Sequence, residues 1–209
     1  MKIIVFGATG MVGKELVKQA LYNGYEVKAY GRNVIFEGLP EDKKVELVQG
    51  ALFDEGDVLF AIKGCDAVLF AVAGSSDGSD KSISLGLKTV VKQMEKAGVK
   101  RIVALGGMGV LNGVNKNMLM EEDDFPPQYN VVSIEHKKAL DILESSSVDW
   151  TMVCPPAIEA GEATGIFNVA ADQLPEPNKE KINSGDLALF MLKQLKQSDY
   201  LQQKVSISY

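Results

Sequence analysis

Three glycines near the start of the chain, Gly7, Gly10 and Gly13, have the spacing of a turn that can bind a diphosphate. They follow the apolar run 2–6, which is too short for a buried helix, and they precede an amphipathic segment that starts at Met11. This order predicts a strand, a tight turn and a helix. In such a turn the first glycine permits the bend, the second lets a pyrophosphate approach the backbone, and the third lets the helix pack on its strand.

The helix predicted from Met11 to about Asn23 would offer free N–H groups and its positive dipole end to phosphates. The alternative is a tight strand-to-helix turn that binds no ligand. We favour a dinucleotide site, because a strand precedes the turn and a helix follows it. Its expected contacts are Gly7, Thr9, Gly10, Met11, Val12 and Gly13.

Arg32 follows the second predicted strand, 26–30, and bears on the choice of dinucleotide. An acid at the end of this strand would accept a hydrogen bond from the 2′-hydroxyl of NAD, whereas an arginine can pair with the 2′-phosphate of NADP. Residues 31–33 contain Arg32 and no acid. The sequence therefore predicts NADP (NADPH) rather than NAD, with a solvated surface arginine as the alternative.

The motif Gly-Ala-Thr-Gly-x-x-Gly after an N-terminal strand resembles that of the atypical and extended short-chain dehydrogenase/reductases. This superfamily includes the NmrA-like proteins and the flavin/biliverdin-IXβ reductases. The chain looks most like the latter over nearly its whole length, through the glycine turn, Arg32 and the segment Val-Cys-Pro-Pro-Ala-Ile at 153–158. The resemblance implies a Rossmann fold and a nicotinamide cofactor.

The polar substrate contacts that the resemblance implies are missing. In that family a serine closes the fifth strand and a histidine follows the double proline, and the matching positions here are Gly107 and Ala157. Relatives also often carry an acid near the adenine, where this chain has Ala51. The resemblance therefore carries over the cofactor site and leaves the substrate undefined.

No residue can be assigned a catalytic role from the sequence. Typical short-chain dehydrogenases use Tyr-x-x-x-Lys, in which lysine lowers the pKa of the phenol. Here Tyr129 is followed at the fourth position by Ser133, and Lys137 is preceded by the same serine. His136 is the only histidine and has a suitable ordinary pKa, but its charged neighbours predict an exposed surface residue.

The remaining apolar patterns predict alternating strands and helices. Strands are expected at 45–48, 65–74, 101–105, 150–153, 166–169 and 204–208, and helices at 57–63, 82–98, 133–147 and from 184. Helix 133–147 would bury Ile134, Ala139, Ile142 and Leu143. This order predicts one α/β domain over 1–209, a doubly wound parallel sheet with a small substrate-side C-terminal part.

The carboxyl ends of the later strands would complete the site, because ligands bind at this edge of a doubly wound sheet. The expected cofactor contacts there are Ala71, Val72, Ala73, Gly106, Gly107, Met108, Pro155, Pro156, Ala157 and Ile158. Segment 75–81 is interpreted as a flap over the crevice or a plain surface loop. Segment 110–132 is interpreted as a substrate loop or a core crossover.

Composition excludes several classes of partner. A net charge of −6 opposes a general nucleic-acid surface. No apolar run is long enough to span a membrane, and the start of the chain lacks an export signal, so we expect a cytoplasmic protein. Cys65 and Cys154 are predicted to be buried and reduced, and no metal site is expected.

These patterns favour an NADP(H)-binding oxidoreductase that reduces an apolar or planar small-molecule substrate such as a flavin, quinone or bilin. Such a protein needs few catalytic side chains, because the cofactor carries the hydride. The main alternative is a non-catalytic NmrA-like sensor, which would pass the state of the dinucleotide to a protein partner. A sugar-nucleotide epimerase or dehydratase is a third reading, opposed by the missing tyrosine–lysine pair.

Overall fold

The computed structural model describes residues 1–36, 38–75, 79–113 and 117–209. The strands are β1 (Lys2–Phe6), β2 (Glu26–Gly31), β3 (Val45–Gln49), β4 (Ala67–Phe70), β5 (Arg101–Leu105), β6 (Asp149–Val153), β7 (Ala157–Glu159), β8 (Asn168–Ala171), β9 (Lys181–Asn183) and β10 (Gln203–Ser208). The α-helices are α1 (Met11–Tyr22), α2 (Glu55–Ile62), α3 (Ser84–Ala97), α4 (Asn130–Glu144) and α5 (Ser184–Gln194). Short 3-10 helices occupy Val34–Phe36, Met108–Val110, Leu119–Glu121 and Pro127–Tyr129.

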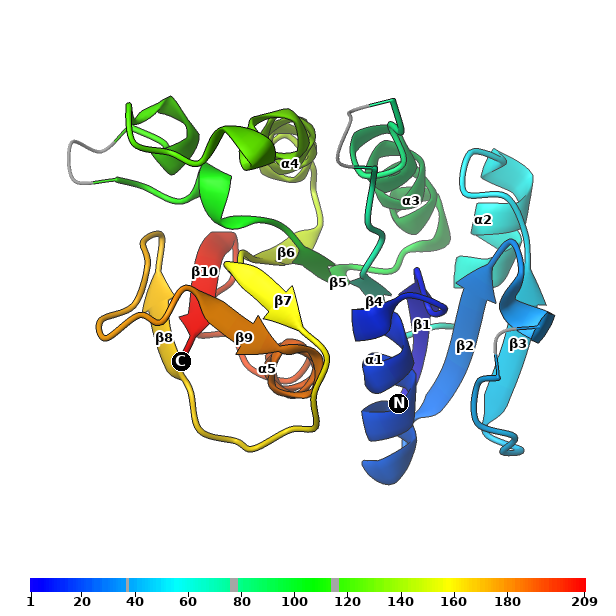
Figure 1. Ribbon diagram of the computed structural model, residues 1–209. Helices are drawn as coiled ribbons and strands as arrows, with labels where there is room; N and C mark the ends of the chain where they lie inside the picture. The colour runs from blue at the N-terminus through cyan, green and yellow to red at the C-terminus, as the bar shows by residue number, and fades with distance from the viewer. Residues whose placement is uncertain (37, 76–78, 114–116) are drawn as a thin grey trace.

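An eight-stranded sheet in the order β3-β2-β1-β4-β5-β6-β10-β8 forms the centre of the molecule (Figure 1). Its neighbouring strands are parallel, except that β8 pairs antiparallel with β10 at one edge. Strands β7 and β9 form a separate parallel pair. The predicted doubly wound α/β fold is therefore confirmed, and its sheet is parallel except at the β8 edge.

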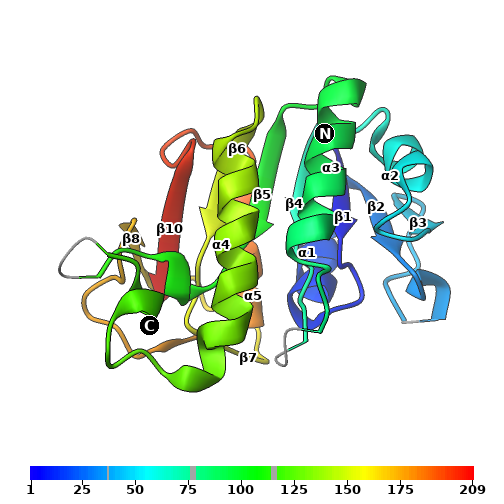
Figure 2. The same ribbon diagram turned by 90° about the horizontal axis from the view of Figure 1, so that it is seen from above.

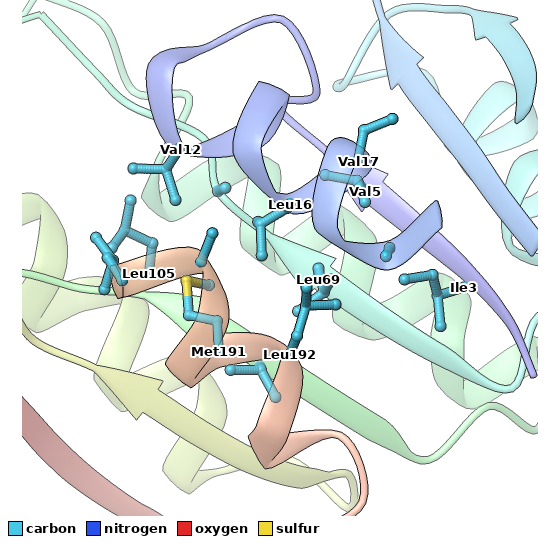
Figure 3. Close-up of a cluster of buried hydrophobic side chains, with 14 of the residues drawn as sticks. Ile3, Val5, Val12, Leu16, Val17, Leu69, Leu105, Met191 and Leu192 are labelled. Carbon is cyan, nitrogen blue, oxygen red and sulfur yellow. The ribbon is translucent and has the colours of Figure 1, made fainter. Parts of the chain in front are cut away.

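Strand β1 shows why helices must cover both faces of this sheet. Its side chains alternate, so that Ile3 and Val5 belong to one buried cluster while Ile4 and Phe6 belong to another. Helices α1 and α5 cover the first face, and α2, α3 and α4 lie side by side over the second (Figures 1 and 2). Figure 3 shows apolar side chains of α1 and α5 directed toward β1 and β4. Burial on both faces explains the continuous apolarity of these strands.

The chain order places a crevice between β1 and β4. Strand β1 connects through α1 to β2 on one side, whereas its other neighbour, β4, continues through α3 to β5 on the opposite side. The crossovers therefore leave in opposite directions from the carboxyl ends of these two strands. This reversal is the point at which open α/β sheets bind ligands.

Several element boundaries differ from the predictions for local reasons. Strand β4 ends at Phe70 instead of continuing to residue 74, because the last ladder bond is that of the Ala71 N–H with the Phe6 carbonyl (2.9 Å). Helix α2 begins earlier, since the Asp54 carboxylate accepts from the N–H groups of residues 56 and 57. Strand β8 lies two residues later than predicted and is antiparallel. The three-residue strands β7 and β9 were not predicted.

The predicted fates of both cysteines are confirmed. Cys65 and Cys154 are buried, and both thiols are free. Burial raises the pKa of the Cys154 thiol to about 12, which keeps it protonated near neutral pH. These residues act as small apolar side chains in the core beside α2 and β6.

A buried carboxylate joins α4 to the start of α3. The side chain of Glu135 is only 3% exposed and accepts hydrogen bonds from Ser84 (2.5 Å), Lys138 (2.8 Å) and Lys81 (3.3 Å). Burial alone would raise the pKa of this carboxyl, but the three donors outweigh it and lower the pKa from 4.5 to about 2. Ionised Glu135 therefore stabilises the fold.

Replacing Glu135 with glutamine should remove this stabilisation and its pH dependence. At about 1.4 kcal/mol per pKa unit, the shift corresponds to a loss of about 3 kcal/mol near pH 7. Because the folded-state pKa is depressed, the contribution is present above pH 4.5 and is lost as the pH falls toward 2. Urea unfolding of the wild type and of Glu135→Gln between about pH 7 and pH 2 measures the difference in the free energy of unfolding.

The matched control is Asp141→Asn on the exposed side of the same helix, where Asp141 pairs with Lys137. Exposed pairs contribute less than about 1 kcal/mol, so this variant should stay close to the wild type. A Glu135→Gln difference that is equally large at both ends of the pH range would contradict the proposed charge effect.

Candidate dinucleotide site

The turn between β1 and α1 is built on glycines that the fold itself requires. Gly7 has φ = +81°, and a Cβ added there would lie 2.5 Å from the Ala71 carbonyl oxygen. A Cβ added to Gly13 would lie 2.0 Å from the Gly7 carbonyl oxygen. Neither position can accept a side chain, so α1 approaches β1 and β4 as closely as its backbone allows.

Gly10 differs from the other two glycines. It has φ = −73°, which any residue can adopt, and the nearest atom to an added Cβ would be the Gly7 carbonyl oxygen at 3.4 Å. The folded protein therefore does not need glycine here. An incoming diphosphate would, because its oxygens must reach the backbone.

The N-terminus of α1 is open to ligands. Gly10 is the N-cap residue, and no described side chain caps this end or places an acid in its first turn. By contrast, Asp54 caps α2 and Asn183 caps α5. The first N–H groups of α1 thus combine with the helix dipole to favour an anion.

A cavity of about 430 Å³ begins at this helix terminus and follows the carboxyl edge of the sheet. Most of the cofactor contacts predicted for the first half of the chain line it. They are Gly7, Thr9, Gly10, Met11, Val12, Arg32, Ala71, Val72 and Ala73, joined by Ile158 from beyond β6. Gly13 does not reach the cavity, because it is buried under the turn.

The expected cofactor contacts omitted part of this cavity, although Ala51 was placed near the adenine and Asp80 in the expected flap. Further lining residues are Tyr30, Gly31, Gly50, Ala51, Leu52, Phe53, Asp80, Ser82 and Leu105. The Tyr30 hydroxyl donates to the Ala51 carbonyl (3.0 Å), and a Cβ on Gly50 would lie 2.4 Å from that hydroxyl oxygen. The glycine directly after β3, Gly50, is the sequence feature that could have indicated this close contact. The result is an apolar slot beside Arg32 that suits a flat ring.

Arg32 lies on the rim of the cavity with its side chain exposed. No carboxylate pairs with its guanidinium among the residues the structure describes, and its carbonyl accepts from the Gln49 amide (2.9 Å). The guanidinium is therefore available to an anion. Its pairing with the 2′-phosphate of NADP stays a prediction.

The remaining predicted contacts lie around a second cavity of about 350 Å³. Gly106, Gly107, Met108, Pro155, Pro156, Ala157 and Ile158 line it, together with Gly109, Tyr129, Val132, Ser133 and His136. Ile158 lines both cavities, so the second adjoins the first. The elements that form it are the ends of β5 and β6, β7 and the first turns of α4.

The prediction that His136 is exposed is wrong. The residue is only 8% exposed, lies on the buried face of α4 and lines the second cavity. Burial lowers the pKa of its imidazole to about 4, although the Glu135 carboxylate opposes this shift. His136 is therefore neutral near pH 7, and its charged neighbours did not indicate this environment. Lys137 and Lys138 remain at the surface, where they pair with Asp141 and Glu135.

The two predicted loops adjoin these cavities. Residues 76–78 of the expected flap and 114–116 of the expected substrate loop lie outside the described residues. Asp80 and Ser82 line the first cavity, and Tyr129 and Val132 line the second. The described ends of both segments thus reach the site.

Two further absences apply to the described part of the chain. It contains no group of three or more His, Cys, Asp or Glu residues that could hold a metal ion. Within the same ranges, no helix combines the length and apolarity needed to cross a bilayer.

Known proteins resemble the chain over almost its full length. A family described as NAD(P)H-binding matches residues 7–198. A Burkholderia pseudomallei protein described as a candidate exported protein is 30% identical with a TM-score of 0.86, and each chain covers 100% of the other. A candidate epimerase from Bacteroides thetaiotaomicron is 25% identical with a TM-score of 0.87, over 100% of this chain and 96% of that one. A candidate NADH-flavin reductase from Streptococcus pneumoniae is 24% identical with a TM-score of 0.80, over 100% and 99%.

Gly10→Ala should separate binding from folding. The added methyl group would block the approach of a diphosphate, so we expect NADPH affinity to fall at least about tenfold, while the free energy of unfolding changes by less than about 1 kcal/mol. Fluorescence titration with NADPH and urea unfolding measure the two quantities.

Gly13→Ala provides the contrast, because its methyl group would overlap backbone atoms within the protein. We expect it to cost about 3 kcal/mol of stability. If Gly10→Ala bound NADPH as tightly as the wild type, the phosphates would not lie at this turn.

Proposed function

The chain belongs to the NAD(P)H-binding family, and from this we propose that it is an oxidoreductase that binds NADPH and reduces an apolar, planar acceptor. One observation carries the proposal. The cavity that begins at the open N-terminus of α1 adjoins a second, largely apolar cavity at Ile158. An elongated dinucleotide and a small acceptor would fill such a pair of cavities.

Each part of the first cavity fits one part of the dinucleotide. Residues 7 and 9–12 would hold the pyrophosphate, with Gly13 acting through the packing of α1. Arg32 would pair with the 2′-phosphate, and the slot formed by Tyr30 and residues 50–53 would hold the adenine. Residues 71–73 would adjoin the middle of the cofactor. Segments 106–108 and 155–158 would surround the nicotinamide.

The bound cofactor supplies a hydride, and the protein's residues position the reactants. The walls of the second cavity include Met108, Tyr129 and Val132, which suit an apolar acceptor and exclude water from it. We assign residues 1–209 to one dinucleotide-binding domain. Within it, β7, β9 and the segment between them form the C-terminal part on the substrate side.

The location of the protein is also part of this proposal. Reduced, buried thiols at Cys65 and Cys154 are consistent with the cytoplasm. The similar Burkholderia pseudomallei protein is described as a candidate exported protein. Fractionation of cells that express the full chain tests the assignment.

Arg32→Ala should reduce the preference for NADPH over NADH. Removing a charged donor from a phosphate weakens binding by about 1–3 kcal/mol, so we expect NADPH affinity to fall about tenfold or more and NADH affinity to change little. Fluorescence titration with each dinucleotide measures this. Lys88→Ala removes an equal charge from the exposed side of α3 and serves as the control. Equal affinity for the two dinucleotides in the wild type would contradict phosphate recognition.

A dinucleotide sensor remains the second candidate. It is favoured by the absence of polar side chains at Gly107 and Ala157, where the reductases that the chain resembles carry a serine and a histidine. The well-formed second cavity favours the enzyme. An epimerase has less support, because the chain has no Tyr-x-x-x-Lys pair.

Steady-state oxidation of NADPH with quinones, flavins and small aldehydes separates these candidates. We expect turnover with planar acceptors and little with aldehydes, whose reduction leaves a strongly basic alkoxide. Tight NADPH binding without turnover on any acceptor would support the sensor instead.

A further inference from the structure

The second cavity contains an imidazole with no assigned task. His136 is buried on α4, and its Nδ1 atom has no hydrogen-bond partner within the described structure. Ser133 lies one turn earlier on the same face and also lines the cavity. Together with Tyr129, these residues supply the polar side chains among walls made mostly of glycine, proline and apolar residues.

One edge of the ring lies against Gly107, which also lines the cavity. A Cβ added to Gly107 would lie 2.9 Å from Cδ2 and 3.2 Å from Nε2 of His136. The Cδ2–Nε2 edge of the imidazole therefore faces the backbone that lines the cavity. A neutral imidazole carries one N–H, and at Nε2 this donor can meet a ligand or water, whereas at Nδ1 it would remain unpaired.

No charged side chain among the described residues pairs with the ring, although the Glu135 carboxylate acts on its pKa. The Glu135 carboxylate is already satisfied by Ser84, Lys81 and Lys138. Lys137 pairs with Asp141 at the surface. The imidazole thus has neither an ion-pair partner nor a protein acceptor for its N–H among the described residues.

We propose that the second cavity binds a quinone and that the Nε2–H group of His136 donates a hydrogen bond to one of its carbonyl oxygens. This inference rests on the proposed NADPH-dependent reduction. It gives the acceptor site a specific donor, contributed by α4 instead of by the ends of β5 and β6.

The chemistry of quinone reduction fits a neutral donor. A quinone that accepts a hydride gains two electrons and one hydrogen and becomes a hydroquinone anion, which then takes one proton from water. The corresponding phenol has a pKa of about 10, whereas the pKa of the alcohol formed from an alkoxide is far higher. The weaker base needs only a hydrogen bond during the reaction. An alkoxide needs a proton donor such as the tyrosine of a Tyr-x-x-x-Lys pair, and Tyr129 of this cavity has no such lysine, because Ser133 occupies that position.

His136 keeps its own proton in this scheme. A general acid would have to be an imidazolium, but burial lowers the pKa of His136 to about 4, so little of that form exists near neutral pH. A neutral imidazole can still donate its N–H to a developing oxyanion. The residue is therefore a hydrogen-bond donor throughout the reaction.

The only histidine of the chain provides a direct readout of this contact. Protein labelled with ¹⁵N-histidine should give one set of imidazole signals. We would record them for the free protein, with NADP⁺, and with NADP⁺ plus menadione, an oxidised pair that cannot react. We expect a clear shift of the Nε2 signal only when menadione is added.

Kinetics of menadione reduction provide the second readout. In His136→Leu, which removes the donor, kcat/KM for menadione should fall about ten- to hundredfold while NADPH affinity is retained. His136→Gln keeps an N–H donor and should recover part of the activity. Lys137→Gln on the exposed side of α4 is the matched control and should behave as the wild type.

The outcomes separate this inference from the proposed function. A full shift of the imidazole signal with NADP⁺ alone would assign His136 to the cofactor and overturn the inference. Unchanged kcat/KM in a folded His136→Leu protein, or no menadione binding while another acceptor turns over, would also overturn it. Failure to bind NADPH at all, in contrast, would refute the proposed function itself.

Discussion

The site depends on the close approach of α1 to the carboxyl ends of the neighbouring strands β1 and β4. The Gly7 carbonyl accepts from the Gly10 N–H (3.0 Å), and there is no space for side chains at Gly7 or Gly13. The helix can therefore start directly above the carboxyl edge of the sheet. A larger residue at either position would overlap backbone atoms, which cannot shift as a flexible side chain can. It would therefore push the N-terminus of α1 away from the first cavity.

The local charges at this edge differ from the overall charge of the molecule. The chain carries a net charge of −6, whereas Arg32 and Asp80 are the charged residues that line the first cavity and the first helix has no acid in its first turn. Charges farther than about 10 Å are largely screened by salt, so the local groups determine which ligand is favoured. An anion site is thus compatible with an acidic protein.

The sequence predicted the parts of the fold that repeat over many residues. Both faces of β1 and one stripe along α3 are apolar, and exposing them to water would cost free energy. These patterns therefore predict that both elements are buried on those faces. Strands β7 and β9 have three residues each and carry no period that a reader of the sequence could recognise. Their pairing depends on chain folding between residues 159 and 181, which is a tertiary effect.

The burial of His136 on α4 could have been predicted from the sequence. The predicted apolar stripe included Ile134, which is 47% exposed, whereas His136 is buried. Apart from Glu135, the buried residues of α4 are Ser133, His136, Ala139, Leu140 and Leu143, which have helical spacing. His136 lies three residues before Ala139 and seven before Leu143, so the helical periodicity alone predicts that it is buried. The adjacent charges received more weight because charged residues are usually exposed.

The glycine at position 107, beyond the end of β5, and the imidazole of His136 on α4 depend on each other. A side chain at the end of β5 and the imidazole on α4 would compete for the same space, since a Cβ at Gly107 would already lie 2.9 Å from the ring. The glycine that removes a polar contact from the strand end therefore makes room for another contact from the helix. In the proposed site the acceptor's hydrogen-bond donor thus comes from α4, whereas in the reductases that the chain resembles a serine closes the fifth strand.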